Sequence, residues 1–270
     1  MLSWVGLAAV ATSVAAQEAN ARPSGQNGDV IAVEVLPGWR EADSTHIAAL
    51  KLTLAHGWKT YWRAPGDAGI PPDFDWSASE NVAEVVPHWP VPDIFTQNGM
   101  RSIGYDDEVV IPLHVLREDP AKPIHLRAEV SLGICEEICI PAFVSLDALL
   151  PAEGSADQDI LTALGDRPLT EDEARVTHVA CLIAPSEDGL GLTVEITMPR
   201  IGRGEAAAIE TSDPSIWVAE PRLRRDGDTL TAQTELIRYN AAPLAVDRSG
   251  IRVTVFGSNT AVDIQGCSTR

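Results

Sequence analysis

Two cysteines with three residues between them form the pair of side chains best suited to chemistry in this sequence. Cys135 and Cys139 stand in the stretch GICEEICIP, residues 133–141. Such a pair can be a structural disulfide, part of a metal site or a pair that exchanges electrons with other thiols. The residues around the pair bear on each of these three uses.

The geometry of the pair depends on how the chain continues after an alternating segment. Apolar and polar residues alternate over 123–132, which predicts a half-buried antiparallel strand ending at Leu132. If that strand continued through both cysteines, their Cα atoms would lie about 13 Å apart, whereas a disulfide tolerates about 7 Å. We therefore expect the chain to turn or coil between them, for example by one helical turn, and predict a small disulfide ring on a loop.

A small ring favours electron exchange over the other two uses. It removes little entropy from the unfolded chain, so it is a weak staple, although secreted domains also keep local disulfides. Glu136 and Glu137 are the nearest additional metal ligands, and zinc prefers four nitrogen or sulfur ligands. Copper(I) can accept two thiolates, so that use stays open, but we assign no metal site. The two glutamates should raise the thiol pKa, which fits a slow relay better than a fast oxidant.

The other two cysteines have the spacing of a staple. A bridge between Cys181 and Cys267 would enclose about 85 residues and would be worth on the order of 4 kcal/mol by loop-closure entropy. The even cysteine count favours this bridge. Two unpaired thiols, or a mobile Cys267 used in transient exchange, are the alternatives.

Composition excludes several classes of function. The 270 residues carry a formal net charge of -19, which argues against binding to a nucleic-acid backbone. No Ser, His and Asp arrangement and no phosphate-binding glycine loop is recognisable, and we expect no small-molecule cofactor.

The N-terminal segment predicts export. Residues 1–16 are apolar, the following residues turn polar, and small residues at Val14 and Ala16 or at Ala19 and Ala21 suit signal peptidase. We predict a signal peptide over 1–21, although this segment lacks the usual Lys or Arg at its start. The apolar run is shorter than the roughly 20 residues that span a bilayer, so an anchor helix is the weaker interpretation. Export would place the cysteines in an oxidising compartment.

Strand patterns dominate the rest of the chain and predict an all-β protein. Short alternating runs predict an immunoglobulin-like β-sandwich over 30–150 and a second, smaller β-sandwich over 172–266, with a linker at 151–171 that holds at most one short helix near 157–164. Because Pro112 lacks an N–H, its strand should lie at a sheet edge or carry a bulge. The expected strands cover 30–36, 46–54, 82–86, 108–116, 123–132, 143–149, 190–198, 229–237 and 251–257.

A long aromatic segment over 56–81 fits neither helix nor strand. It contains Trp58, Trp62, Trp76 and Tyr61 among prolines and glycines. Long irregular segments in compact domains are often functional, but these rings can also simply close the open end of the sandwich.

Three ordered motifs resemble a known family. HGWKTYWRAPGDAGIPP, WPVPDIFTQNGMRSIGYDDEVVIPL and GICEEICIPA are similar to the N-terminal periplasmic domain of the thiol:disulfide interchange protein DsbD family, particularly its ScsB-like form. The resemblance covers about residues 30–150. It implies an immunoglobulin-like sandwich in the periplasm and activity as a component of a thiol:disulfide oxidoreductase.

The resemblance also implies roles for individual residues. Cys135 and Cys139 correspond to the exchanging pair, with Cys139 the one that joins partners. Phe95 matches the cap loop, whose ring covers the disulfide until a partner displaces it, and Asp93 lies in the same segment. Tyr61 and Trp62 match aromatic positions that flank the pair.

Partners follow from the same resemblance. A thioredoxin-like protein or a membrane thiol transporter would be the electron donor, and periplasmic disulfide proteins would be the acceptors. The chain shows neither the membrane domain nor the thioredoxin-like domain of full-length relatives, so the donor would be a separate protein. The alternative hypothesis is a non-catalytic periplasmic module that docks a partner or binds copper and whose cysteines are structural.

Overall fold

The computed structural model describes residues 20–21, 29–41, 44–66, 69–97, 99–238 and 244–269. The predicted signal peptide over 1–21 therefore lies outside the described residues, apart from Asn20–Ala21. Among the described residues, no helix has the length and apolar character needed to cross a membrane.

The predicted all-β class is confirmed, because strands make up most of the described chain and one α-helix accompanies them. In chain order the elements are β1 Asn20–Ala21, β2 Ile31–Arg40, β3 Thr45–Leu54, β4 Lys59–Tyr61, β5 Asp73–Asp75, β6 Glu84–Pro87, β7 Asp93–Gln97, β8 Met100–Asp106, β9 Glu108–Leu116, β10 Ile124–Cys135, β11 Cys139–Leu150, α1 Gln158–Gly165, β12 His178–Pro185, β13 Leu190–Thr197, β14 Ala206–Glu210, β15 Trp217–Val218, β16 Arg222–Asp226, β17 Thr229–Ile237, a 3₁₀ turn Arg248–Gly250, β18 Arg252–Phe256, β19 Ala261–Gln265 and β20 Ser268–Thr269.

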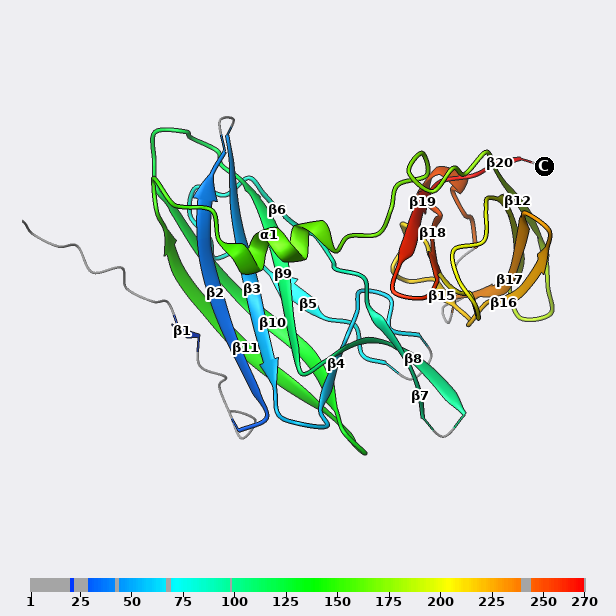
Figure 1. The fold of residues 1–270 in the computed structure, drawn as a ribbon, viewed down its shortest axis with the longest axis horizontal. Helices are drawn as coiled ribbons and strands as arrows, with labels where there is room; N and C mark the ends of the chain where they lie inside the picture. Colours follow the sequence, from blue (N-terminus) through cyan, green and yellow to red (C-terminus); the bar gives the residue numbers. More distant parts are fainter. Residues whose placement is uncertain are drawn as a thin grey trace, which may run out of the picture.

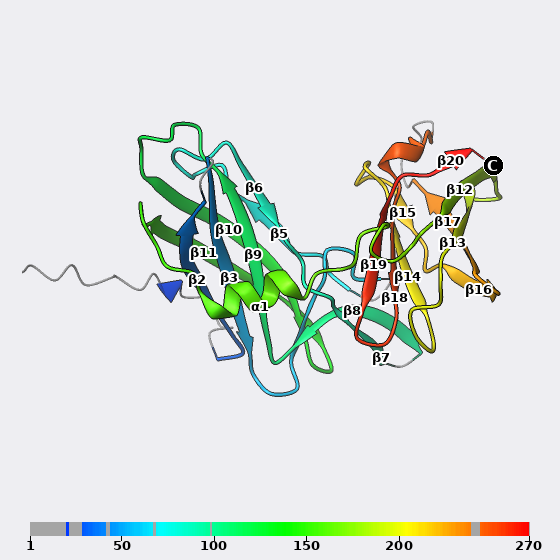
Figure 2. The ribbon, with the colours of Figure 1, turned by 45° about the horizontal axis from the view of Figure 1, so that its top comes forward.

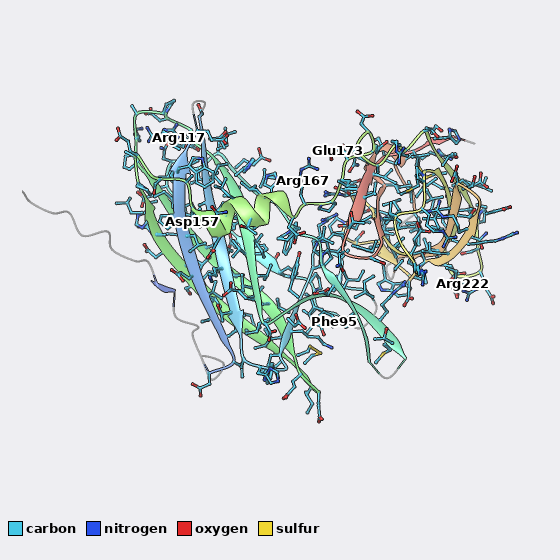
Figure 3. All side chains as sticks on the ribbon, in the orientation of Figure 1. Phe95, Arg117, Asp157, Arg167, Glu173 and Arg222 are labelled. Carbon is cyan, nitrogen blue, oxygen red and sulfur yellow. A yellow bond between two sulfur atoms is a disulfide. The ribbon has the colours of Figure 1, made fainter. Side chains whose placement is uncertain are left out.

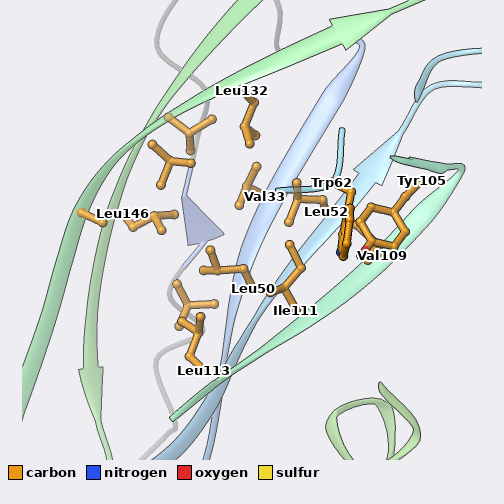
Figure 4. Close-up of a cluster of buried hydrophobic side chains, with 14 of the residues drawn as sticks. Val33, Leu50, Leu52, Trp62, Tyr105, Val109, Ile111, Leu113, Leu132 and Leu146 are labelled. Atoms are coloured by element: carbon orange, nitrogen blue, oxygen red, sulfur yellow. The ribbon is translucent and has the colours of Figure 1, made fainter. Parts of the chain in front are cut away.

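Two sheets form the first sandwich. One has the order β1-β2-β3-β9-β6, and the other has the order β11-β10-β4-β8-β7 with β5 paired to β10 (Figure 1). Their facing sides supply alternate residues to one core, as the period of two predicts. Figure 4 shows this core between the sheets; its labelled members are Val33, Leu50, Leu52, Trp62, Tyr105, Val109, Ile111, Leu113, Leu132 and Leu146.

Two further sheets form the second part of the chain, which is the second sandwich. They have the orders β15-β17-β13-β12-β20, with β16 paired to β17, and β14-β18-β19. The smaller sheet faces the first sandwich in both ribbon views (Figure 2). Ala206, Ala208, Phe256 and Ala261 from this side of the second part belong to the buried cluster of the first sandwich. The two hydrophobic cores are therefore joined by packed side chains.

The prediction for Pro112 is wrong. Its strand β9 lies between β3 and β6, and its pairing with β3 runs from Thr45 to Thr53 without a bulge. The short strand β6 ends its pairing at Leu113, and the carbonyl of Pro112 then accepts a hydrogen bond from the N–H of His88. The missing N–H of the proline falls where this pairing stops, so an interior strand tolerates it.

The short helix lies close to its predicted position and covers the first sandwich. The side chain of Asp157 caps α1 by accepting from the N–H groups of Asp159 and Ile160. Ile160 is fully buried in a cluster with Leu36, Ile47 and Ala49. Figure 1 shows α1 lying across the sheet that contains β2, β3 and β9. The predicted linker thus includes a helix packed against the first sandwich.

Candidate functional site

The cysteine pair lies at the tip of a long β-hairpin. Strand β10 continues three residues beyond its predicted end and β11 begins four residues earlier than predicted, so that Cys135 and Cys139 are directly opposite partners. Their Cα atoms are 4.2 Å apart and their sulfurs are bonded. The chain does reverse between them, but through the three-residue connection Glu136–Glu137–Ile138 rather than through a helical turn.

Strand register places most of the residues predicted to surround the cysteine pair on one face of the sheet, with Trp62 as the exception. Cys135 is opposite Lys59 on β4, Tyr61 on β4 is opposite Gly104 on β8, and β8 in turn pairs with β7. Directly opposite residues point to the same side of a sheet, and residues two apart along a strand do so as well. The residues that share the outer face with the disulfide are Lys59, Tyr61, Asp93 and Phe95.

The two cysteines differ in their exposure to solvent. Cys135 is buried, with 1% of the residue exposed, whereas Cys139 is an exposed residue. Ile138, immediately before Cys139, is 75% exposed. A molecule approaching from solvent therefore meets Cys139 before Cys135.

Tyr61 contacts both sulfurs. Its hydroxyl lies 2.7 Å from the Sγ of Cys135 and 3.2 Å from the Sγ of Cys139. Sulfurs joined in a disulfide carry no hydrogen, so the hydroxyl is the donor. Burial raises the pKa of Tyr61, which keeps the phenol protonated and able to donate.

Two glycines make room for the Tyr61 ring. A Cβ on Gly133 would lie 3.0 Å from the Cδ2 of Tyr61 and 2.7 Å from the Cβ of Ile70, and a Cβ on Gly69 would lie 2.9 Å from the Cδ1 of Tyr61. Thr60 also donates a hydrogen bond to the carbonyl of Gly133 at 3.0 Å. The ring thus lies between the backbone at Gly69 and the backbone at Gly133, where a side chain on either residue would clash with it.

Phe95 reaches the strand next to the disulfide. Its ring lies 5.2 Å from the Nζ of Lys59, which is the residue opposite Cys135, so the two side chains form a cation–π contact. Phe95 stands on the β7–β8 hairpin, which projects from the first sandwich toward the second (Figure 3). Sequence reasoning missed Lys59, although its spacing of two from Tyr61 in KTY is the signal for a shared strand face.

Trp62 and Asp93 lie away from the sulfurs. Trp62 is fully buried in the core, where its ring packs edge-on against Phe256 at 5.4 Å. Asp93 lines a cavity of about 340 Å³ together with Asp106 and Asp166. Burial, and then the negative charge of Asp106, raises the pKa of Asp93.

The second pair of cysteines is also bonded. Cys181 and Cys267 form a disulfide whose Cα atoms are 5.7 Å apart and whose sequence separation is 86. It ties strand β12 to the end of the chain, where β20 pairs with β12.

For metal chemistry, the described part of the chain contains no group of three or more His, Cys, Asp or Glu side chains that could hold an ion.

The fold and the site together define an immunoglobulin-like sandwich that presents a half-exposed disulfide at the tip of a hairpin. Residues 31–151 match the family described as thiol:disulfide interchange protein DsbD, N-terminal, so the predicted resemblance is confirmed for the first sandwich.

A solved structure is similar over nearly the whole chain. The crystal structure of the N-terminal periplasmic domain of ScsB from Proteus mirabilis aligns with a TM-score of 0.67 and 22% identity, covering 93% of this chain and 100% of that chain. At this identity the similarity shows a shared fold that includes the second part of the chain. The comparison with curated proteins found no match.

Proposed function

We propose that this chain is a periplasmic thiol–disulfide exchange module that relays electrons through Cys135 and Cys139. The observation that carries the proposal is the asymmetry of the disulfide, with one exposed cysteine, one buried cysteine and a tyrosine hydroxyl that contacts both sulfurs. The family match over 31–151 supports the same class of chemistry.

The exchange begins at the exposed cysteine, Cys139. A thiolate of the donor attacks the Sγ of Cys139, a new disulfide forms between donor and Cys139, and the Cys135–Cys139 bond breaks. The electron pair of the broken bond passes to Cys135, whose thiolate accepts the hydrogen bond of Tyr61. The donor's second cysteine, as a thiolate, then attacks the sulfur of the donor's first cysteine in the mixed disulfide. This step releases Cys139 as a thiolate. The donor leaves oxidised, and the chain holds two reduced cysteines.

The reduced pair passes its electrons on by the reverse sequence. The thiolate of Cys139 attacks an oxidised periplasmic protein, and Cys135 resolves the mixed disulfide. By resemblance to the family, the donor is a thioredoxin-like protein or a membrane thiol transporter. Phe95 acts as a cap that restricts the access of unrelated thiols to this face.

Trapping of the mixed disulfide tests this function. In a chain with Cys135→Ser, the remaining thiol of Cys139 should capture a thioredoxin-like donor activated at its first cysteine, whereas Cys139→Ser should capture little. Both variants should abolish electron transfer to an oxidised acceptor. A chain with Cys181→Ala and Cys267→Ala is the matched control and should keep transfer.

Two results would contradict the proposal. Unchanged transfer in either Cys135→Ser or Cys139→Ser would exclude the relay. A reduction potential of the pair below about -300 mV would identify a structural bond and favour the alternative of a binding module.

A further inference from the structure

Arg63 connects the strand of Tyr61 to the second sandwich. Its Nε lies 3.1 and 3.2 Å from the two carboxylate oxygens of Glu210 at the end of β14. Its second terminal nitrogen lies 3.1 Å from Glu210, 3.2 Å from the hydroxyl of Thr254 and 3.7 Å from Asp263. The side chain is only 14% exposed. Planar guanidinium groups bound in this way fix both position and orientation.

The residue before Arg63 makes a second contact with the same sandwich. Trp62 packs edge-on against Phe256 of β18, and the guanidinium of Arg63 stacks 3.9 Å from the centre of the Trp62 ring. Trp62 and Arg63 directly follow Tyr61, the last residue of β4. Beyond β4, the N–H of Trp62 donates to the carbonyl of Ile103 on β8, and the N–H of Ile103 donates to the carbonyl of Pro65. The second sandwich adds side-chain contacts to these backbone hydrogen bonds where β4 ends.

We propose that Arg63 is a positioning residue through which the second sandwich holds the Tyr61 hydroxyl against Cys135. This inference rests on the proposed exchange function, because it gives the second sandwich a role in the chemistry of the disulfide. Strand β4 has three residues, and hydrogen bonds with Ile103 of β8 hold the backbone just beyond it. The contacts of Arg63 with Glu210, Thr254 and Asp263 add side-chain support from outside the first sandwich.

The consequence is chemical as well as structural. When the disulfide is cleaved by attack on Cys139, the electron pair arrives at Cys135 and the Tyr61 hydroxyl stabilises the resulting thiolate. A displaced hydroxyl would stabilise this leaving group less. Loss of Arg63 should therefore slow reduction of the pair in the same direction as loss of the hydroxyl itself.

A double-mutant cycle on the full chain tests this coupling. The measured quantity is the rate at which dithiothreitol reduces the Cys135–Cys139 pair, followed by alkylation and mass spectrometry. We expect Tyr61→Phe to slow reduction about tenfold and Arg63→Ala about fivefold, as befits the loss of a hydrogen bond to a charged group. The variant with both changes should be no slower than Tyr61→Phe alone, because Arg63 acts through the hydroxyl. Arg63→Lys, which keeps the charge but not the planar fork, should fall between Arg63→Ala and wild type.

The matched control removes a different ion pair between the two sandwiches. Arg101 on β8 lies 2.7 Å from Glu220, and strand alternation directs its side chain away from the face that bears Phe95. Arg101→Ala should leave the reduction rate unchanged. Equal slowing by Arg101→Ala, or multiplicative effects of Tyr61→Phe and Arg63→Ala, would overturn the proposal.

Stability is measured in parallel, since removing Arg63 leaves two partly buried carboxylates without this partner. If Arg63→Ala does not fold, Glu210→Gln and Asp263→Asn replace it in the cycle. Each, combined with Tyr61→Phe, should then be reduced no more slowly than Tyr61→Phe alone. Dithiothreitol needs no protein docking site, so the cycle gives its answer whether or not a thioredoxin-like donor reduces the chain. A failure of the exchange function and a failure of the Arg63 coupling are thereby distinguished.

Discussion

The Tyr61 hydroxyl lies closer to the Sγ of the buried residue Cys135, at 2.7 Å, than to the Sγ of the exposed residue Cys139, at 3.2 Å. In the oxidised pair this difference has little chemical effect, because neither sulfur carries charge. In the proposed exchange, the shorter contact would stabilise the thiolate of Cys135 after cleavage. It thereby supports the proposal that Cys135 is the leaving group and that Cys139 meets partners.

Removing this hydroxyl should raise the thiol pKa of Cys135. In a chain with Cys139→Ser, which leaves Cys135 as the single thiol of the pair, we expect Tyr61→Phe to raise that pKa by about one unit, since a charge-assisted hydrogen bond is lost. Iodoacetamide alkylation rates measured against pH give the value. Tyr105→Phe is the control, because the Tyr105 hydroxyl donates to the carbonyl of Pro90 instead. An unchanged pKa in Tyr61→Phe would show that the contact does not persist in the reduced state.

Removing the Phe95 ring should speed reduction by small thiols. The ring covers Lys59 beside the disulfide, so Phe95→Ala opens this side of the face. We expect reduction of the oxidised pair by glutathione to accelerate about threefold if Phe95 acts as the proposed cap, because the rate of attack on a disulfide depends on access. Ile94→Ala is the matched control, since Ile94 is 37% exposed and alternation turns it to the other face of β7. A cap role would be excluded if both variants reacted at the wild-type rate.

The sequence contains enough information for the strand pattern but not for the way the strands assemble around the site. Alternation over 123–132 predicts β10, and the argument about Cα spacing correctly requires a reversal between Cys135 and Cys139. It does not predict the hairpin, because a three-residue connection and a helical turn satisfy the same distance limit.

Pairing between distant strands explains the remaining differences. Pro112 looks like an edge residue in sequence, yet it is paired with Ala49 of β3, and the pairing of β6 with β9 stops at Leu113, one residue before the missing N–H would be needed. Lys59 contacts Phe95 on β7, and Arg63 contacts Glu210 on β14 and Asp263 on β19. These partners are distant in sequence, so the residues next to Lys59 and Arg63 do not predict the contacts.

A methyl group on Gly133 should destabilise the site and the fold. The added Cβ would lie 2.7 Å from the Cβ of Ile70 and 3.0 Å from the Tyr61 ring, so these groups must move. We expect Gly133→Ala to reduce the free energy of unfolding by about 1–3 kcal/mol, as for other overpacked positions. Gly165→Ala is the control, because a Cβ there meets nothing within 4 Å at the end of α1. Urea titration measures the free energy of unfolding of both variants. A Gly133→Ala chain as stable as wild type would contradict the expected clash.

Breaking the Cys181–Cys267 disulfide should cost stability without stopping exchange. The sequence separation of 86 corresponds to about 4–5 kcal/mol of loop-closure entropy in the unfolded chain. A chain with Cys181→Ala and Cys267→Ala should therefore unfold at lower urea concentration, while dithiothreitol reduces its Cys135–Cys139 pair at the wild-type rate. A change in that rate would show that the second disulfide influences the first.

His88 should make the fold sensitive to mild acid. Burial and the neighbouring ring of His114, 3.9 Å away, lower the pKa of His88 from 6.5 to about 4. In the unfolded chain His88 therefore binds a proton below pH 6.5, whereas in the folded chain it does so only below about pH 4. Stability present above pH 6.5 is lost across this interval, by an amount on the order of 1–2 kcal/mol after allowing for partial exposure.

Replacing the imidazole with an uncharged ring isolates this contribution. His88→Phe should flatten the decline in unfolding free energy between pH 6.5 and pH 4, while the backbone N–H of residue 88 can still donate to Pro112. His178→Asn, at an exposed position, should keep the wild-type slope. Urea titrations at a series of pH values measure the slopes. A His88→Phe chain that declines as steeply as wild type would assign the acid sensitivity to other groups.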